Sequence, residues 1–217
     1  MRKVELEVSF YFLFSDCGET MLLVKLTISD QRLTGPPVKP YPCSSLTSIK
    51  LINTIKLPGY VHSVAKHHDF VYAGLEDNTI MYFEYHKNPH TVCKFAKLQG
   101  RPSSIQAYNN ELYVLSVSSQ RILVYGFDKK LRRSWSHQSI SDAFNKLRVV
   151  NNRVIVPGRS EKSLAVYDLQ GNFIKQITCP TLSTNWKALA VCGDDSVILS
   201  DYGAGSVSRI NVDSGEV

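Results

Sequence analysis

The stretch Phe70-Val71-Tyr72-Ala73-Gly74 decides the fold, because its apolar pattern occurs four times in this chain. It returns as LYVLS at residues 112–116, VIVPG at 154–158 and VILSD at 197–201, at intervals of 42, 42 and 43 residues. The segment TIMYF at residues 79–83 repeats at the same intervals, at 121–125, 163–167 and 206–210. A period in the low forties with several short strands in each unit is typical of the blades of a β-propeller.

Each repeat divides into short strands separated by turn residues. In the second repeat we expect strands at residues 104–108, 112–116, 121–127 and 131–135. They are runs of β-branched, aromatic and aliphatic residues, whereas Asn109-Asn110 supplies residues that tolerate positive φ in a tight turn. Because such a sheet has two apolar faces, neighbouring sheets must pack against it. The sequence therefore predicts an all-β fold, a β-propeller with about four four-stranded blades.

The region before the repeats has a different pattern. Apolar residues alternate with polar ones from Val4 to Phe14, and again from Leu22 to Ile28, which predicts an N-terminal β-hairpin over residues 1–30 as an atypical or partial blade. Four of the nine prolines lie between Pro36 and Pro42, so we expect an extended linker over residues 31–48. Residues 49–217 are then propeller blades.

The last repeat reaches only a turn at residues 213–217, so we expect the last blade to be truncated. Four repeats are fewer than the roughly six or seven blades with which propellers of this kind usually close. We therefore expect the chain to be a fragment of a larger protein or an open array that a partner closes.

Composition points to a soluble protein of a reducing compartment. The five cysteines are an odd number, none is spaced CxxC, and no signal peptide is recognisable. The longest dense apolar stretch, residues 8–14, is too short for a membrane-spanning helix. We expect a cytoplasmic location and no membrane partner.

The search for catalytic or metal-binding motifs finds little. His86 and His90 have the spacing HxxxH, but Pro89 lies between them in an expected turn, so they do not share a helical face. No GxSxG, P-loop or GxGxxG motif is present. We expect no catalytic residues, no metal and no cofactor.

Propellers use the loops at one end of the blades for binding: the loop that enters each blade and the loop between its second and third strands. On this end, which we call the entry rim, large aromatic rings and guanidinium groups suit a recognition surface. The alternative for Tyr60 and Trp186 is that they fill gaps between blades. The candidate binding residues are Tyr60, His62, Arg101, Arg159, Trp186, Asp201 and Tyr202.

The chain has a formal net charge of +6, and basic residues are concentrated between Lys97 and Arg133. A local excess of positive charge could attract an acidic protein or a phosphate backbone, but a solvated outer strand and turn is the favoured explanation. The candidate basic patch comprises Lys97, Arg121, Lys129, Lys130, Arg132 and Arg133.

Two segments resemble the NHL repeat. Residues 183–191 followed by 194–201 match its entry loop, inner strand, acidic turn and strand ending in Asp, and residues 166–173 resemble its hairpin. Gly74, Ser116 and Gly158 stand where Asp is usual. The resemblance implies a propeller similar to those of tripartite-motif (TRIM-NHL) ubiquitin ligases, which recognise proteins or RNA and carry out no chemistry themselves. No RING, B-box or coiled coil is recognisable, so ligase activity is not carried over.

The leading hypothesis is a non-catalytic module that binds a protein partner through the entry rim, as the substrate-recognition part of a ubiquitin-ligase-like protein. One alternative is RNA binding on the basic patch, with an affinity that falls steeply with salt. Another is calcium-dependent lactone hydrolysis, as in gluconolactonase-like propellers, with Asp201 and Asn185 as candidate ligands.

Overall fold

The fold is described from a computed structural model, in which residues 20–28, 46–87, 91–116, 118–137, 146–158, 162–183 and 186–217 are placed. These residues form 17 β-strands, and no helix occurs among them. The chain divides into two compact units, Met1–Tyr60 and Val61–Val217.

In the first unit, β1 (Thr20–Ile28) pairs antiparallel with β2 (Leu46–Lys56). The expected partner strand at residues 4–14 and most of the proline-rich stretch lie outside the described residues. Since β2 pairs with β1, residues 49–56 belong to this sheet, although we expected the blades to begin at residue 49.

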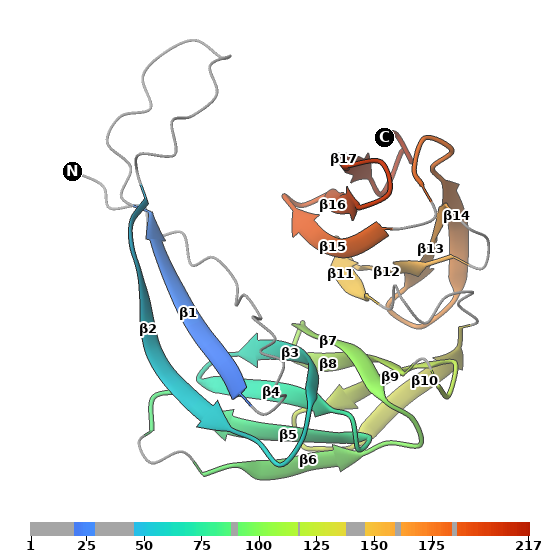
Figure 1. The fold of residues 1–217 in the computed structure, drawn as a ribbon. Helices are drawn as coiled ribbons and strands as arrows, with labels where there is room; N and C mark the ends of the chain where they lie inside the picture. Colours follow the sequence, from blue (N-terminus) through green and yellow to red (C-terminus); the bar gives the residue numbers. More distant parts are fainter. Residues whose placement is uncertain are drawn as a thin grey trace. The chain divides into compact units, whose positions relative to one another are not determined.

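The second unit consists of four antiparallel sheets, one for each repeat (Figure 1). Blade 1 contains β3 (Val61–His67), β4 (Phe70–Leu75), β5 (Thr79–Glu84) and β6 (Cys93–Lys97). Blade 2 contains β7 (Pro102–Tyr108), β8 (Glu111–Ser116), β9 (Arg121–Gly126) and β10 (Leu131–Ser136). Blade 3 contains β11 (Arg148–Val150), β12 (Arg153–Pro157), β13 (Ser163–Asp168) and β14 (Phe173–Thr178). Blade 4 contains β15 (Trp186–Cys192), β16 (Ser196–Asp201) and β17 (Ser206–Asn211).

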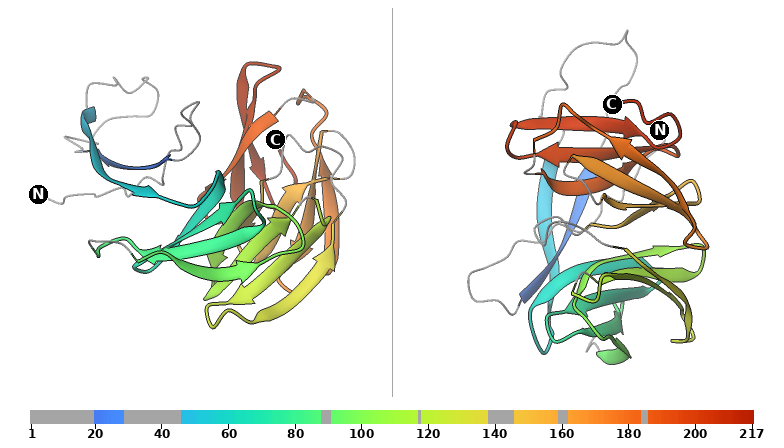
Figure 2. Two further views of the ribbon diagram at one scale, coloured as in Figure 1. Left: turned by 60° about the horizontal axis from the view of Figure 1, so that its bottom comes forward. Right: turned by 90° about the vertical axis from the view of Figure 1, so that its right-hand side faces the viewer.

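The first strand of each blade lies beside the first strand of the next. β3 contacts β7, β7 contacts β11, and β11 contacts β15, so these inner strands follow one another as in a propeller (Figure 2). This arrangement confirms the all-β propeller with four blades. The fourth blade has three strands within the described residues rather than four.

Apolar side chains fill the space between neighbouring blades. One core joins blades 1 and 2 through Tyr72, Phe95 and Leu112, and a second joins blades 2 and 3 through Tyr113 and Val154. A third joins blades 3 and 4, with members that include Val166, Leu189 and Leu199. Burying one large aliphatic or aromatic side chain contributes about 1.5–3 kcal/mol. Each blade is therefore stabilised mainly by its neighbours.

The turns have the backbone conformations that the sequence predicts. Asn109, Asn110, Asn151 and Asn152 all have positive φ, between 45° and 58°. Asparagine tolerates this left-handed conformation better than other non-glycine residues, which explains its position between the first and second strands.

Candidate binding surface

The entry rim is formed by two sets of loops that are bonded to each other in three blades. The backbone N–H that follows the fourth strand donates to the carbonyl that ends the loop between strands two and three. The pairs are Leu98 to Asn78, His137 to Gln120 and Cys179 to Lys162, each at 2.8 Å. Asn78, Gln120 and Lys162 have positive φ. Both loops of each of these blades are therefore held together at this end of the sheet.

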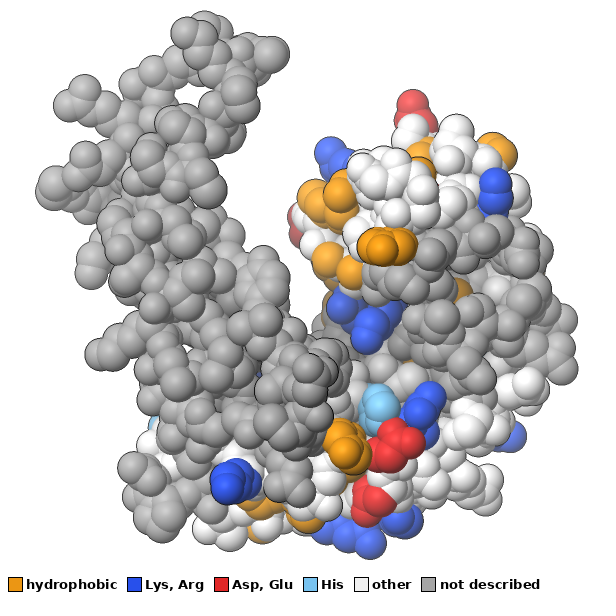
Figure 3. All heavy atoms as spheres, viewed as in Figure 1, with side chains coloured by type: hydrophobic (Ala, Val, Ile, Leu, Met, Phe, Trp, Pro, Cys, Tyr) orange, Lys and Arg blue, Asp and Glu red, His pale blue; other side chains and the backbone are white. Residues whose placement is uncertain are grey.

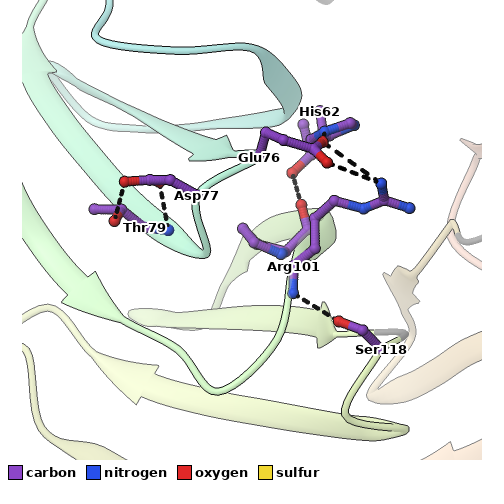
Figure 4. A network of polar contacts seen from close by, with 8 residues as sticks. His62, Glu76, Asp77, Thr79, Arg101 and Ser118 are labelled. Atoms are coloured by element: carbon purple, nitrogen blue, oxygen red, sulfur yellow. Dashed lines mark hydrogen bonds and ion pairs between the residues drawn. The ribbon is translucent and has the colours of Figure 1, made fainter.

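A polar cluster on the entry rim links blades 1 and 2 (Figure 4). Glu76, in the loop after β4, accepts a hydrogen bond from the Nε2 of His62 on β3. On its other side, the NH1 of Arg101 lies 3.4 Å from the Glu76 Oε1. The backbone N–H of Arg101 also donates to the Ser118 hydroxyl at 2.9 Å. The loop before β7 is thus fixed to loops of its own blade and of the preceding one.

The charges in this cluster act on Glu76. The hydrogen bond from His62 is the main cause that lowers the pKa of the Glu76 carboxyl, and the charge of Arg101 lowers it further. Glu76 is half exposed and Arg101 about one third exposed, so both side chains remain accessible to a partner. Figure 3 shows histidine, acidic and basic side chains close together over blades 1 and 2.

The neighbouring Asp77 has a structural role. Its carboxylate accepts hydrogen bonds from the backbone N–H of Thr79 at 3.0 Å and from the Thr79 hydroxyl at 2.9 Å. Lys97 donates to the Asp77 carbonyl and lies 3.7 Å from its carboxylate. These contacts fix the turn between β4 and β5.

In blade 4, Asp201 ends β16 and is 2% exposed. Its carboxylate accepts hydrogen bonds from the backbone N–H and hydroxyl of Ser183 and from the backbone N–H of Ala204 at 3.0 Å. The Ser183 hydroxyl is the main cause that lowers the pKa of Asp201. The next residue, Tyr202, is 72% exposed. Asp201 therefore anchors a loop that presents an aromatic side chain to solvent.

The other candidate rim residues are placed only in part. Tyr60 is 59% exposed and belongs to the first compact unit, so it is not placed relative to the blades. Trp186 begins β15, where its backbone pairs with Asp201. Arg159 lies outside the described residues. Of the predicted set, the structure brings together His62 and Arg101, and it places Asp201 next to Tyr202.

The residues of the basic patch are distributed over both ends of the blades. Arg121 begins β9, on the side of the entry rim, whereas Lys129 and Lys130 follow the other end of that strand. The Arg132 NH2 lies 2.9 Å from Asp128, and Arg133 forms a two-pronged pair with Glu111 at 2.6 and 2.7 Å. The Lys129 ammonium lies 4.8 Å from the centre of the Tyr82 ring. Several of these cations thus have partners within the protein.

Sequence reasoning missed two cations at the start of blade 3. Lys146 precedes β11 by two residues and Arg148 begins it, and both are partly buried. They occupy the repeat positions of Ser104 and Gln106, which lie 42 residues earlier. The 42-residue spacing identifies these equivalent positions from the sequence alone. It does not reveal their role, which becomes apparent only from the contacts that Ser104 and Gln106 make with blade 3.

The described residues contain no group of three or more His, Cys, Asp or Glu side chains that could hold a metal ion. Asp201, a candidate calcium ligand, directs its oxygens at Ser183 and Ala204, and Asn185 lies outside the described part of the chain. His86, one of the HxxxH pair, lies 3.6 Å from Asp69, and His90 is among the residues not described. A search of the described residues also finds no helix long and apolar enough to cross a membrane.

Comparisons with known proteins support the fold alone. No family model matches the sequence, and a search of curated proteins gives no match. Among solved structures, the WD40 β-propeller domain of Doa1 is similar with a TM-score of 0.60 and 16% identity, over 77% of this chain and 58% of that one. The computationally designed Ika4 protein has a TM-score of 0.56 and 18% identity, over 72% of this chain and 93% of that one.

The computationally designed Ika8 protein gives a TM-score of 0.55 and 17% identity, over 77% of this chain and 51% of that one. The chain thus spans little more than half of the length of the Doa1 and Ika8 chains. It has a β-propeller fold similar to a WD40 propeller.

Proposed function

We propose that this chain is a non-catalytic interaction module that binds a protein partner through the entry rim of blades 1 to 4. The observation that carries the proposal is Tyr202, which is 72% exposed beside Asp201, a buried residue whose carboxylate accepts three hydrogen bonds. A large aromatic ring on a rigid support supplies contact area with little loss of conformational entropy, and such residues dominate binding energies at interfaces.

Arg101 supports the same interpretation. Its backbone is fixed by Ser118 and its guanidinium by Glu76, yet the side chain remains partly exposed. A guanidinium group has five N–H donors, so donors remain for a partner after these contacts are made. A side chain held in place before binding loses less entropy when the complex forms.

The finer form of the proposal is that the propeller is NHL-like and selects substrates for a ubiquitin-ligase-like protein in the cytoplasm. It is supported by the NHL-like pattern at residues 183–201, in which a strand ends in an Asp that bonds to the entry loop through Ser183. The RNA alternative has less support, because Lys97, Arg132 and Arg133 lie beside Asp77, Asp128 and Glu111. These pairs reduce the excess charge that a phosphate backbone needs.

The test is a pull-down from lysate with three forms of the full chain: wild type, Arg101→Ala/Tyr202→Ala, and the matched control Arg153→Ala/Phe173→Ala. The control removes a cation and an exposed aromatic ring from blade 3, at the end of its sheet away from the entry rim. We expect one or more proteins to be retained by the wild type and the control and lost by the rim variant.

The melting temperature of each variant is measured in parallel, and we expect the rim variant to stay close to the wild type because both changed side chains are partly or largely exposed. Equal retention of every captured protein by the rim variant and the wild type contradicts the proposal. So does equal loss in the rim variant and the control.

A further inference from the structure

Blades 2 and 3 are joined by hydrogen bonds between side chains of β7 and the backbone of blade 3. The Ser104 hydroxyl accepts from the backbone N–H of Leu147 at 3.0 Å. The Gln106 amide donates to the carbonyl of Val149 at 3.0 Å and accepts from its N–H at 2.9 Å. The first strand of blade 2 thus uses two neutral polar side chains to bond the first strand of the next blade.

In blade 3 the same two positions are occupied by Lys146 and Arg148. A cation cannot accept a hydrogen bond, so this pair cannot reproduce the contacts that Ser104 and Gln106 make. The guanidinium of Arg148 donates only to the carbonyl of the adjacent Leu147, at 2.7 Å, among the described residues. Lys146 makes no hydrogen bond or ion pair with a described residue.

Both cations point to the same side of the chain. Leu147 and Val149 pack in the core between blades 2 and 3, and Val150 packs in the core between blades 3 and 4. Side chains alternate along an extended chain, so those of Lys146 and Arg148 lie on the side of blade 4, with their Cα atoms about 7 Å apart. Figure 3 shows a group of Lys and Arg side chains over the region that β11 occupies in Figure 1.

Four of the six other arginines of the described blades lie beside a carboxylate, whereas Arg121 and Arg153 donate to the Ser134 hydroxyl and to the Asn152 carbonyl. Such ion pairs are formed by Arg101, Arg132, Arg133 and Arg209, at 3.4, 2.9, 2.6 and 3.6 Å respectively. Burial lowers the pKa of both Lys146 and Arg148, and the positive charge of Arg148 lowers that of Lys146 further. Two partly buried like charges with no counter-charge among the described residues destabilise the folded protein, and an incoming anion would relieve that cost.

We propose that Lys146 and Arg148 form a binding site for a carboxylate group on an acidic segment of the protein partner. The inference rests on the proposed function, because the pair lies at the start of β11, at the same end of the blades as Arg101 and Tyr202. A guanidinium binds both oxygens of a carboxylate, and the ammonium of Lys146 adds a second charge within reach.

The test measures binding of a fluorescein-labelled hexaglutamate peptide to the full chain by fluorescence anisotropy, at constant ionic strength. A hexaglutamine peptide is the uncharged reference. The main variant, Lys146→Ser/Arg148→Gln, replaces the two cations by the residues that blade 2 has at the equivalent positions, Ser104 and Gln106. The control, Lys130→Gln/Arg153→Gln, removes the same charge from the opposite end of the blades, where Lys130 is exposed and Arg153 is partly exposed.

We expect the wild type to bind hexaglutamate more tightly than hexaglutamine. The main variant should lose at least about tenfold in affinity, as expected for removal of charge-assisted hydrogen bonds. The control should change affinity by no more than about twofold, because distant charges are screened. Without peptide, the main variant should melt at a higher temperature than the wild type, whereas the control should not.

Equal loss of affinity in the main variant and the control overturns the proposal, because binding would then depend on overall charge. Absence of binding to hexaglutamate also overturns it. Binding of inorganic phosphate without binding of hexaglutamate overturns it too, because the site would then not be one for carboxylates. If the main variant does not fold, Arg148→Lys retains the charge but not the two-pronged geometry, and wild-type affinity in that variant contradicts the assignment of Arg148. The peptide assay needs no partner, so its failure is distinguishable from a failure of the pull-down.

Discussion

Arg133 shows how a single residue links two blades. Its NH1 and NH2 donate to both oxygens of Glu111 and its NH2 donates to the Tyr113 hydroxyl at 3.0 Å, all within blade 2. Its Nε donates to the carbonyl of Leu169 in blade 3, at 2.6 Å. The side chains of Arg133 and Glu111 are each 22% exposed, so water screens this pair less than an ion pair on an open surface. The sequence predicts only that Arg133 belongs to a basic patch, because nothing local indicates a partner 22 residues away.

This pair predicts a specific dependence of stability on pH. The hydrogen bonds from Arg133 are the main cause that lowers the pKa of the Glu111 carboxyl below its ordinary value. Because the folded-state pKa is depressed, the stabilisation is fully present above the pKa of the unfolded chain and is lost as the pH falls through the folded-state pKa.

We therefore expect Glu111→Gln to be less stable than the wild type at pH 7 by about 1–2 kcal/mol. As the pH falls, the free energy of unfolding should decrease less in this variant than in the wild type, because the variant lacks the ion pair that acid disrupts. Urea denaturation between pH 7 and pH 3 measures both effects. Glu216→Gln, which changes an exposed carboxylate near the end of the chain, is the control. Parallel pH profiles for the wild type and Glu111→Gln would show that the pair does not stabilise the fold.

At the scale of strands, the repeats determine both the sheets and the bonds between them. The sequence predicted the strands of blade 2 closely, since β7 to β10 begin or end within about two residues of the expected positions. Alternating apolar residues and Asn turns are local signals, so they can be recognised without a structure. The hydrogen bonds from Ser104 and Gln106 to blade 3 join residues 43 positions apart and leave no local signal.

These cross-blade bonds should have a measurable effect on stability. Gln106→Ala removes both hydrogen bonds to Val149 and leaves a partly buried backbone N–H and C=O without that partner. We expect the free energy of unfolding to fall by about 2 kcal/mol, measured by urea denaturation. Gln170→Ala, in an exposed turn of blade 3, serves as the control and should have little effect. If the two variants are equally stable, the cross-blade bonds do not stabilise the protein.

At the scale of the whole second unit, the propeller brings together loops that are distant in the sequence. His62, Glu76 and Arg101 meet on the entry rim because β3 and β7 lie side by side. The repeat alone predicts that His62 and Arg101 share one rim, but it does not specify that Glu76 lies between them. A period identifies equivalent positions, whereas the contacts between them depend on side-chain conformations that the period does not specify.

The central claim is that partners bind to the entry rim, and amide hydrogen exchange tests it most directly. Exchange is compared for the free full chain and for its complex with a protein captured by the wild type and lost by Arg101→Ala/Tyr202→Ala. We predict slower exchange in the complex at residues 98–101, 118–120 and 202–205, with no change at the opposite turns, residues 109–110, 151–152 and 193–195. Protection of the opposite turns with unchanged exchange on the entry rim would contradict the account.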